Sequence, residues 1–204
     1  MIEGSRDSGA KPDGITPSQT VGPFFAYVLT PHEYATRPIF SNDLGTPDAA
    51  GQAIRIEGYV IDGDGEPIVD AMVEIWQADG EGRYAGARGG PTNAAFTGFG
   101  RTDLDTNGFY SFATVKPGQV AGPGGASQAP HIDVGIFARG LLKRLFTRIY
   151  FEGEAANAAD PILALVPEER RGTLVASRRE RGHEIVYTFN IRLQGEDETV
   201  FFDA

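Results

Sequence analysis

The sequence predicts an all-β fold, an antiparallel β-sandwich or barrel with long loops and about one short helix. Short runs in which apolar and polar residues alternate recur along the chain, and this alternation is typical of strands with one buried face. Turn-forming residues separate the runs, in keeping with a content of 27 Gly and 13 Pro. With 204 residues, 41% of them hydrophobic, the chain is long enough to bury a substantial core in a single domain.

The strands follow from the alternation, as the first one illustrates. Ile54, Ile56 and Val60 share one parity, so a strand here buries them on a common face. The expected strands cover residues 54–60, 71–77, 109–115, 129–136, 148–151 and 185–193, with an edge strand at 199–202. The connections are a hairpin turn at 62–65, an irregular segment at 78–100, a turn at 103–108 and a Gly-rich loop at 118–127.

The one expected helix lies near residues 167–177. Pro167 suits the first turn of a helix, because that turn does not need its backbone N–H. Glu168 and Glu169 then stand near the positive end of the helix dipole.

The ends of the chain differ in character from its middle. Residues 1–14 have little to bury and are expected to form a mobile tail, followed by a single domain over 15–204. Within that domain, residues 15–50 form an N-terminal arm rich in Pro and aromatic residues, which we expect to pack on a partner chain.

Charge and composition exclude several classes of function. A formal net charge of -10 argues against binding nucleic acid or anionic membrane surfaces, both of which need concentrated Lys and Arg. No apolar run reaches the length of a membrane span. The absence of Cys excludes disulfides and thiolate metal sites and fits a cytoplasmic location.

His131 and Asp133 are the first candidate site residues. They alternate with Ile132 on an expected buried strand and so point to the same face. One interpretation is a hydrogen-bonded polar pair, which is the common fate of buried polar groups. The other is the start of a two-His-one-carboxylate iron(II) site, for which His183 is the only downstream His, and it lies at an expected hairpin tip.

Tyr84 and Arg139 are further candidates. Tyr84 ends a Gly-Arg-Tyr run in the irregular segment and could either pack and hydrogen-bond or ligate a ferric ion as phenolate. Arg139 directly follows the strand of His131 and is either a solvated charge or a bidentate partner for a carboxylate. Trp76 is expected to belong to the core.

Taken together, seven segments resemble intradiol aromatic-ring dioxygenases, and most closely the alpha chain of the two-chain members that cleave protocatechuate. The resemblance covers essentially everything after the tail. The matching segments are TPSQTVGPF, RIEGYVIDGDGEPIVDAMVEIWQADGEGRY, GFGRTD, GFYSFATVKPG, APHIDVGIFARG, TRIYF and IRLQGEDETVFFDA.

The resemblance implies that this chain lacks a complete iron site. In the catalytic chains of the family, two Tyr and two His hold a non-haem ferric ion, and an Arg stands three residues before the first His. We call the matching residues here the vestigial positions: Tyr84, Val120, Gln128, His131 and Asp133. Val has no donor atom, and Asp replaces the second His. The resemblance therefore implies no catalytic residue and no metal in this chain alone.

The resemblance also implies a fold and partners. It implies a transthyretin-like or immunoglobulin-like sandwich core and αβ protomers in a larger symmetric oligomer, with Fe(III) bound by the homologous beta chain. Thr20 and Pro23 of the arm, and Arg139, are expected to line the substrate cavity of that partner. The implied reaction is cleavage of protocatechuate by O2 to 3-carboxy-cis,cis-muconate.

Two other functions stay open at this point. One is a purely structural sandwich subunit, in which Arg139 and the arm do not affect substrate affinity. The other is an independent His-x-Asp iron(II) oxygenase, which requires metal in the isolated chain.

Overall fold

The computed structural model describes residues 29–30, 38–46, 49–86 and 96–203. These residues form eleven strands and short 3₁₀ helices. The strands are β1 (Ala53–Ile61), β2 (Met72–Trp76), β3 (Phe99–Asp103), β4 (Phe109–Val115), β5 (Val120–Ala121), β6 (Ser127–Gln128), β7 (His131–Phe137), β8 (Leu145–Phe151), β9 (Val175–Arg181), β10 (Glu184–Thr188) and β11 (Ile191–Arg192). The helices are η2 (Pro123–Gly125), η3 (Ala155–Ala159), η4 (Leu163–Leu165) and η5 (Glu168–Leu174).

Nine strands form one mixed, nearly closed sheet. Its order is β11-β1-β10-β9-β8-β7-β2-β3, with β4 paired to β1, while β5 and β6 form a separate hairpin. The mostly β prediction is confirmed, but a wholly antiparallel arrangement is wrong, because β1 runs parallel to β10 and β11, and β8 runs parallel to β9. Turn signals reveal hairpins between neighbours in sequence, whereas parallel pairs join segments that a crossover separates.

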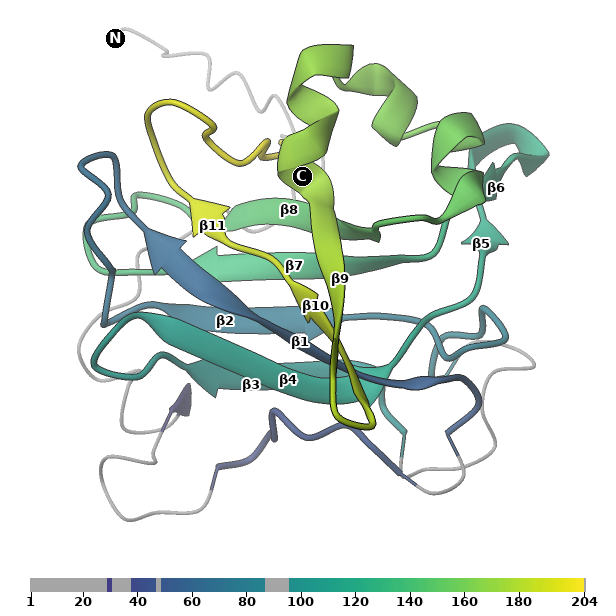
Figure 1. Ribbon diagram of the computed structural model, residues 1–204, viewed down its shortest axis with the longest axis horizontal. Coiled ribbons are helices and arrows are strands. Elements are labelled where there is room, and N and C mark those ends of the chain that lie inside the picture. The colour runs from purple at the N-terminus through teal and green to yellow at the C-terminus, as the bar shows by residue number, and fades with distance from the viewer. Residues whose placement is uncertain (1–28, 31–37, 47–48, 87–95, 204) are drawn as a thin grey trace, which may run out of the picture.

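The core lies between the two halves of this sheet. In Figure 1, β1 is drawn across β2, and β4 is drawn over β3. Side chains from β1, β4, β2 and β7 belong to one apolar cluster. Its members include Ile54, Ile56, Val60, Phe112, Tyr187, Val73, Ile75, Ile132, Val134, Ile136 and Ile149. The alternation that predicted β1 is confirmed, because its even-numbered apolar side chains are buried here.

A second apolar cluster lies under the helices. Leu163, Val166 and Leu174 pack with Tyr150 and Ala129, so η4 and η5 cover one end of β7 and β8. The helix expected at 167–177 is a 3₁₀ helix over Glu168–Leu174 with Pro167 at its N-cap. It ends earlier than expected because the chain continues into β9.

The strand expected at 185–193 is interrupted where it passes β1. The Phe189 N–H donates to the carbonyl oxygen of Glu57 at 2.8 Å, and Asn190 Oδ1 accepts from the Tyr59 N–H at 3.1 Å. A Cβ on Gly58 would lie 1.8 Å from the Phe189 carbonyl oxygen, so only glycine permits this approach. The result is two short strands, β10 and β11, on the same edge of β1.

Other expected elements differ in detail. The turn at 62–65 forms, with Asp62 Oδ1 accepting from the N–H groups of Asp64 and Glu66, but β1 and β2 do not pair with each other. Strands β3 and β9 were not expected. The segment expected as an edge strand forms an isolated bridge between Phe202 and Phe146.

Part of the arm is described and lies along its own chain. Leu44 donates its N–H to the Ala113 carbonyl at 2.8 Å, and Ala113 donates to the Asn42 carbonyl at 2.9 Å, so the segment runs beside β4. Packing of the arm on a partner stays a prediction, and the tail at 1–14 lies outside the described residues. No helix in the described part of the chain has the length and hydropathy that crossing a bilayer requires.

Candidate functional site

The vestigial positions gather around the start of β7. The register places Asp133 directly between Trp76 of β2 and Arg148 of β8, so these three side chains share one face of the sheet. His131 lies two residues earlier on the same face, opposite Tyr150. The prediction that His131 and Asp133 share a face is therefore confirmed by the strand pairing.

Arg148 connects two of the vestigial positions. Its Nε lies 2.9 Å from Asp133 Oδ1, and its Nη1 donates to Gln128 Oε1 at 2.7 Å. Burial opposes the charge on this guanidinium, but Asp133, Tyr150 and Asp160 outweigh that effect and raise the pKa of Arg148. A planar guanidinium with carboxylate and amide partners is a stable, permanently charged group.

His131 is buried and neutral. Only 3% of its surface is exposed, and its Nδ1 lies 2.7 Å from the Ala129 carbonyl oxygen. Burial, followed by the nearby positive charge of Arg148, lowers the pKa of His131. The contact with a carbonyl places the proton on Nδ1, so Nε2 presents a lone pair, and it has no hydrogen-bond partner among the described residues.

Val120 cannot ligate a metal, and Tyr84 packs against a neighbouring aromatic ring. The Tyr84 ring stacks on Trp76, with centroids 5.7 Å apart and an interplanar angle of 12°. Burial and the charge of Asp133 raise the pKa of the Tyr84 phenol, against a smaller opposing effect of Arg148. Val120 is a buried residue of β5 and pairs with Gln128 of β6.

The residues present do not fit a ferric ion. Val120 offers no donor atom, and the Asp133 carboxylate, which stands where the iron-binding chains have their second His, is engaged by Arg148. Within the described ranges, no group of three or more His, Cys, Asp or Glu side chains could hold a metal ion. Among the vestigial positions, His131 has a ligating nitrogen, Nε2, without a hydrogen-bond partner in the described part of the chain.

Asp160 fixes this end of the strand pair. It is buried, and its Oδ2 accepts from the Ala129 N–H at 2.7 Å. Its Oδ1 accepts from the Tyr150 hydroxyl at 3.0 Å and from the N–H groups of Ile162 and Leu163 at 2.9 and 2.7 Å. One carboxylate thus ties β7, β8 and η4 together around His131.

Sequence reasoning missed Arg148 and Asp160. The signal for Arg148 was present, because Arg148 and Tyr150 alternate with Ile149 on an expected strand and so share one face. What the alternation could not supply was the pairing of that strand with β7. Asp160 lies in a loop and carried no periodic signal.

Arg139 lies at the other end of β7 from His131. Its side chain is 87% exposed, and its Nε lies 2.9 Å from Asp70 Oδ2. His131 begins the seven-residue strand β7 and Arg139 lies beyond its far end, so Arg139 does not join the vestigial positions. Thr20 and Pro23 lie outside the described residues, and His183 lies exposed at the β9–β10 hairpin tip, as expected. Trp76, expected in the core, is partly exposed on the sheet face.

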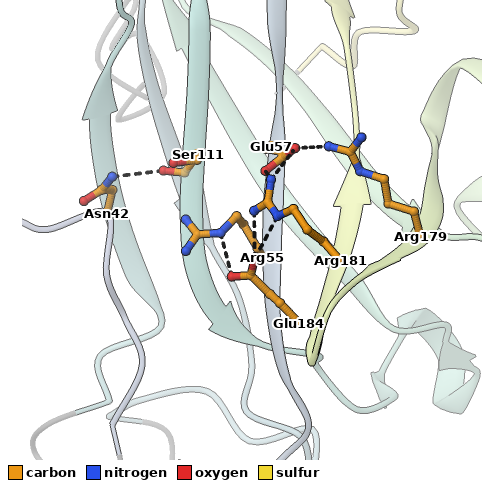
Figure 2. Close-up of polar contacts among 7 residues, drawn as sticks. All are labelled: Asn42, Arg55, Glu57, Ser111, Arg179, Arg181 and Glu184. Carbon is orange, nitrogen blue, oxygen red and sulfur yellow. Dashed lines mark hydrogen bonds and ion pairs between the residues drawn. The ribbon is translucent and has the colours of Figure 1, made fainter.

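A second polar cluster lies on the outer face of β1, β9 and β10. Figure 2 shows Glu57 reached by the guanidinium groups of Arg179 and Arg181, and Arg55 paired with Glu184 at 2.7 Å. The Glu57 side chain is buried, and both arginines satisfy it. Such an arrangement compensates a buried carboxylate and has a structural role.

Comparison with known proteins identifies the family of this chain. A family model described as "Dioxygenase" matches residues 21–195. The chain is 49% identical over 195 residues to the protocatechuate 3,4-dioxygenase alpha chain of Burkholderia cepacia, covering 93% of this chain and 97% of that one. It is 36% identical over 169 residues to the beta chain from the same organism, covering 78% of this chain and 71% of that one.

A solved structure has the same fold. The dioxygenase domain of a carbohydrate-binding fusion protein from Streptomyces sp. SirexAA-E superposes with a TM-score of 0.59 at 25% identity, covering 88% of this chain and 98% of that one. The family model spans most of the sequence and the alpha-chain relative spans nearly all of it, in agreement with the motifs. This chain belongs to the dioxygenase family.

Proposed function

We infer that this chain is the alpha subunit of a protocatechuate 3,4-dioxygenase, a site-forming subunit that binds no iron itself. The observation that carries this is the near full-length similarity to an alpha chain, combined with vestigial positions that do not fit a ferric ion. The reaction adds both atoms of O2 to protocatechuate and opens the ring between its hydroxylated carbons, giving 3-carboxy-cis,cis-muconate. We assign the ferric ion to a homologous beta chain.

The finer features of the assembly belong to the same proposal. We propose a transthyretin-like sandwich core, a single domain over 15–204, and an arm over 15–50 that packs on the beta chain. The αβ protomers form a larger symmetric oligomer in the cytoplasm, where the enzyme serves aromatic catabolism. The high similarity to both alpha and beta chains supports descent of the two subunits from one fold.

Arg139 is the residue of this chain that we assign to the substrate. Its guanidinium is exposed beyond the end of β7 and, among the described residues, is paired with Asp70, so it can reach across an interface. Protocatechuate carries a carboxylate remote from its reacting hydroxyls, and an Arg fork binds a carboxylate in bidentate fashion. Thr20 and Pro23 are proposed to line the same cavity.

Two alternatives are less well supported. An independent iron(II) oxygenase needs Asp133 as a ligand, but Arg148 engages that carboxylate. A purely structural subunit gives Arg139 no role beyond its surface ion pair with Asp70.

The test is steady-state kinetics of the reconstituted αβ enzyme carrying Arg139→Ala. Losing a charge-assisted hydrogen bond of roughly 1.5–3 kcal/mol raises the Michaelis constant for protocatechuate by about one to two orders of magnitude. Arg139→Lys recovers part of the loss, because an ammonium lacks the planar fork. The Michaelis constant for catechol, which has no carboxylate, is expected to change little.

Lys143→Ala is the matched control, because it removes another exposed cation from the same loop. Iron content is measured in every sample. Equal losses on both substrates mean that Arg139 supports assembly instead, and no loss on either favours the purely structural subunit.

A further inference from the structure

Asp70 and Arg139 form an ion pair where β2 begins and β7 ends. Nε of Arg139 lies 2.9 Å from Asp70 Oδ2. The antiparallel register of β2 and β7 places Met72 opposite Phe137, so continuing that register by two residues on each strand places Asp70 opposite Arg139. Residues two apart along a strand point to the same face. The two side chains therefore meet because the strand pairing sets them side by side.

We propose that Asp70 is a positioning residue for substrate binding, whose carboxylate orients the guanidinium of Arg139 toward the substrate cavity at the interface. The inference rests on the proposed function for the role of Arg139. It goes beyond that function by naming the residue that gives this long side chain its direction. Asp70 acts through Arg139 and does not touch the substrate itself.

The backbone on both sides of Asp70 is fixed. Before it, Ile68 donates its N–H to the Val60 carbonyl oxygen at 2.9 Å. After it, Ala71 is buried in the core. The short Asp side chain is 38% exposed, whereas the long side chain of Arg139 is 87% exposed. Asp70 is therefore the fixed member of the pair, and Arg139 is the member that gains order from the contact.

The contact leaves the carboxylate-binding end of Arg139 available. Asp70 approaches Nε, which is the guanidinium nitrogen nearest to the main chain. Nη1 and Nη2 lie beyond it and form a planar fork that can hold a substrate carboxylate with two parallel bonds. An arginine side chain has many rotamers, and those that point away from the cavity are lost when substrate binds. A guanidinium that is already oriented therefore binds the carboxylate more tightly.

Two effects of Asp70 oppose each other and differ in sign. Its negative charge repels the anionic substrate, whereas its contact with Nε orients Arg139. The cationic guanidinium stands between the two carboxylates and offsets their repulsion, so we expect the orienting effect to be the larger one. Removing the Asp70 carboxylate then weakens substrate binding, whereas a role through charge alone requires that it strengthen binding.

The experiment is steady-state kinetics of the reconstituted αβ enzyme carrying Asp70→Ala. The Michaelis constant for protocatechuate is expected to rise roughly three- to tenfold, the cost of ordering one long side chain on binding. The value of kcat is expected to change little, because the reacting atoms are unaffected. The Michaelis constant for catechol, which lacks the carboxylate, is expected to stay the same. Asp70→Asn keeps an oxygen that can face Nε and is expected to recover part of the loss.

Two further samples separate positioning from other roles. In the Arg139→Ala background, Asp70→Ala is expected to add no further loss, because no guanidinium is left to orient. Asp203→Ala is the matched control, because it removes a carboxylate that pairs with Lys143 of the same loop, and it is expected to leave both Michaelis constants unchanged. An exposed ion pair contributes little to stability, so the unfolding midpoint of Asp70→Ala is expected to match that of the wild type.

Three results would overturn the positioning role of Asp70. They are a Michaelis constant for protocatechuate that is unchanged or lower in Asp70→Ala, an equal rise for catechol, and a full additional loss in the Arg139→Ala background. If Arg139→Ala itself leaves the Michaelis constant unchanged, the assignment of Arg139 to the substrate fails and the role of Asp70 fails with it. A loss in Arg139→Ala without one in Asp70→Ala overturns the role of Asp70 alone.

Discussion

At the scale of single residues, His131 shows how burial sets the protonation of a site. Its ring is nearly inaccessible, its Nδ1 faces a carbonyl oxygen, and the cation of Arg148 stands close by. All of the polar surroundings that could stabilise an imidazolium, Asp133 and Asp160 among them, are outweighed by burial and Arg148. The neutral ring is therefore part of the folded state.

This predicts a pH dependence of stability. The pKa of His131 is lowered from its ordinary value of 6.5 in the folded chain. Just below pH 6.5, His131 is therefore protonated in the unfolded chain but still neutral in the folded chain. The free energy of unfolding contributed by His131 is thus fully present above pH 6.5 and falls as the pH drops toward the lowered value. One such proton accounts for at most about 1.4 kcal/mol per pH unit.

His131→Gln is expected to flatten this slope below neutral pH, as measured by denaturant unfolding over a pH series. His183→Gln is the control, because it removes an imidazole from an exposed hairpin tip. A slope that is unchanged in His131→Gln, or flattened equally in both variants, assigns the acid sensitivity to other groups.

At the scale of elements, Asp160 holds three segments in register. Its Oδ1 accepts three hydrogen bonds. Its Oδ2 accepts one, from the N–H of Ala129, just before β7. Because the carboxylate is buried, a donor that loses this acceptor cannot bond to water instead and is left unsatisfied.

Asp160→Ala is expected to lower the free energy of unfolding by at least about 3 kcal/mol, because four donors lose their acceptor. Asp160→Asn can keep the Oδ1 bonds but sets an N–H₂ against the Ala129 N–H, so it costs about 1–3 kcal/mol. Tyr150→Phe removes one donor and costs about 1 kcal/mol. Denaturant unfolding gives this order directly, and an Asn variant as unstable as the Ala variant means that the negative charge itself is required.

The elements also show what local sequence can predict. Strand β4 was expected at the residues where it occurs, because its alternation is strong and turns bound it on both sides. The shared face of His131 and Asp133 followed from the same periodicity. The parallel pairs of β1 with β10, and the approach of Arg148 to Asp133, depend on which distant strands become neighbours, and no local pattern encodes that choice.

At the scale of the whole molecule, large apolar side chains remain exposed in several places. Leu142, in the loop that follows Arg139, is 89% exposed, and Leu165 of η4 is 78% exposed. Ile39 and Phe40 of the arm are also exposed. Exposed apolar groups of this size commonly mark surfaces that a partner covers. They belong to the arm, a helix and a loop, so more than one contact surface is implied.

The chain alone is therefore expected not to persist as a stable monomer. Sedimentation velocity at micromolar concentration should show self-association or aggregates for the isolated chain, and one defined larger species when it is produced with the beta chain. Leu142→Glu should weaken that assembly, because it places a carboxylate where we expect the partner to cover an apolar side chain, while Glu180→Gln on the exposed face of β9 should not. A well-folded, soluble monomer that is unaffected by the beta chain contradicts this prediction and removes the main support for an obligate αβ protomer.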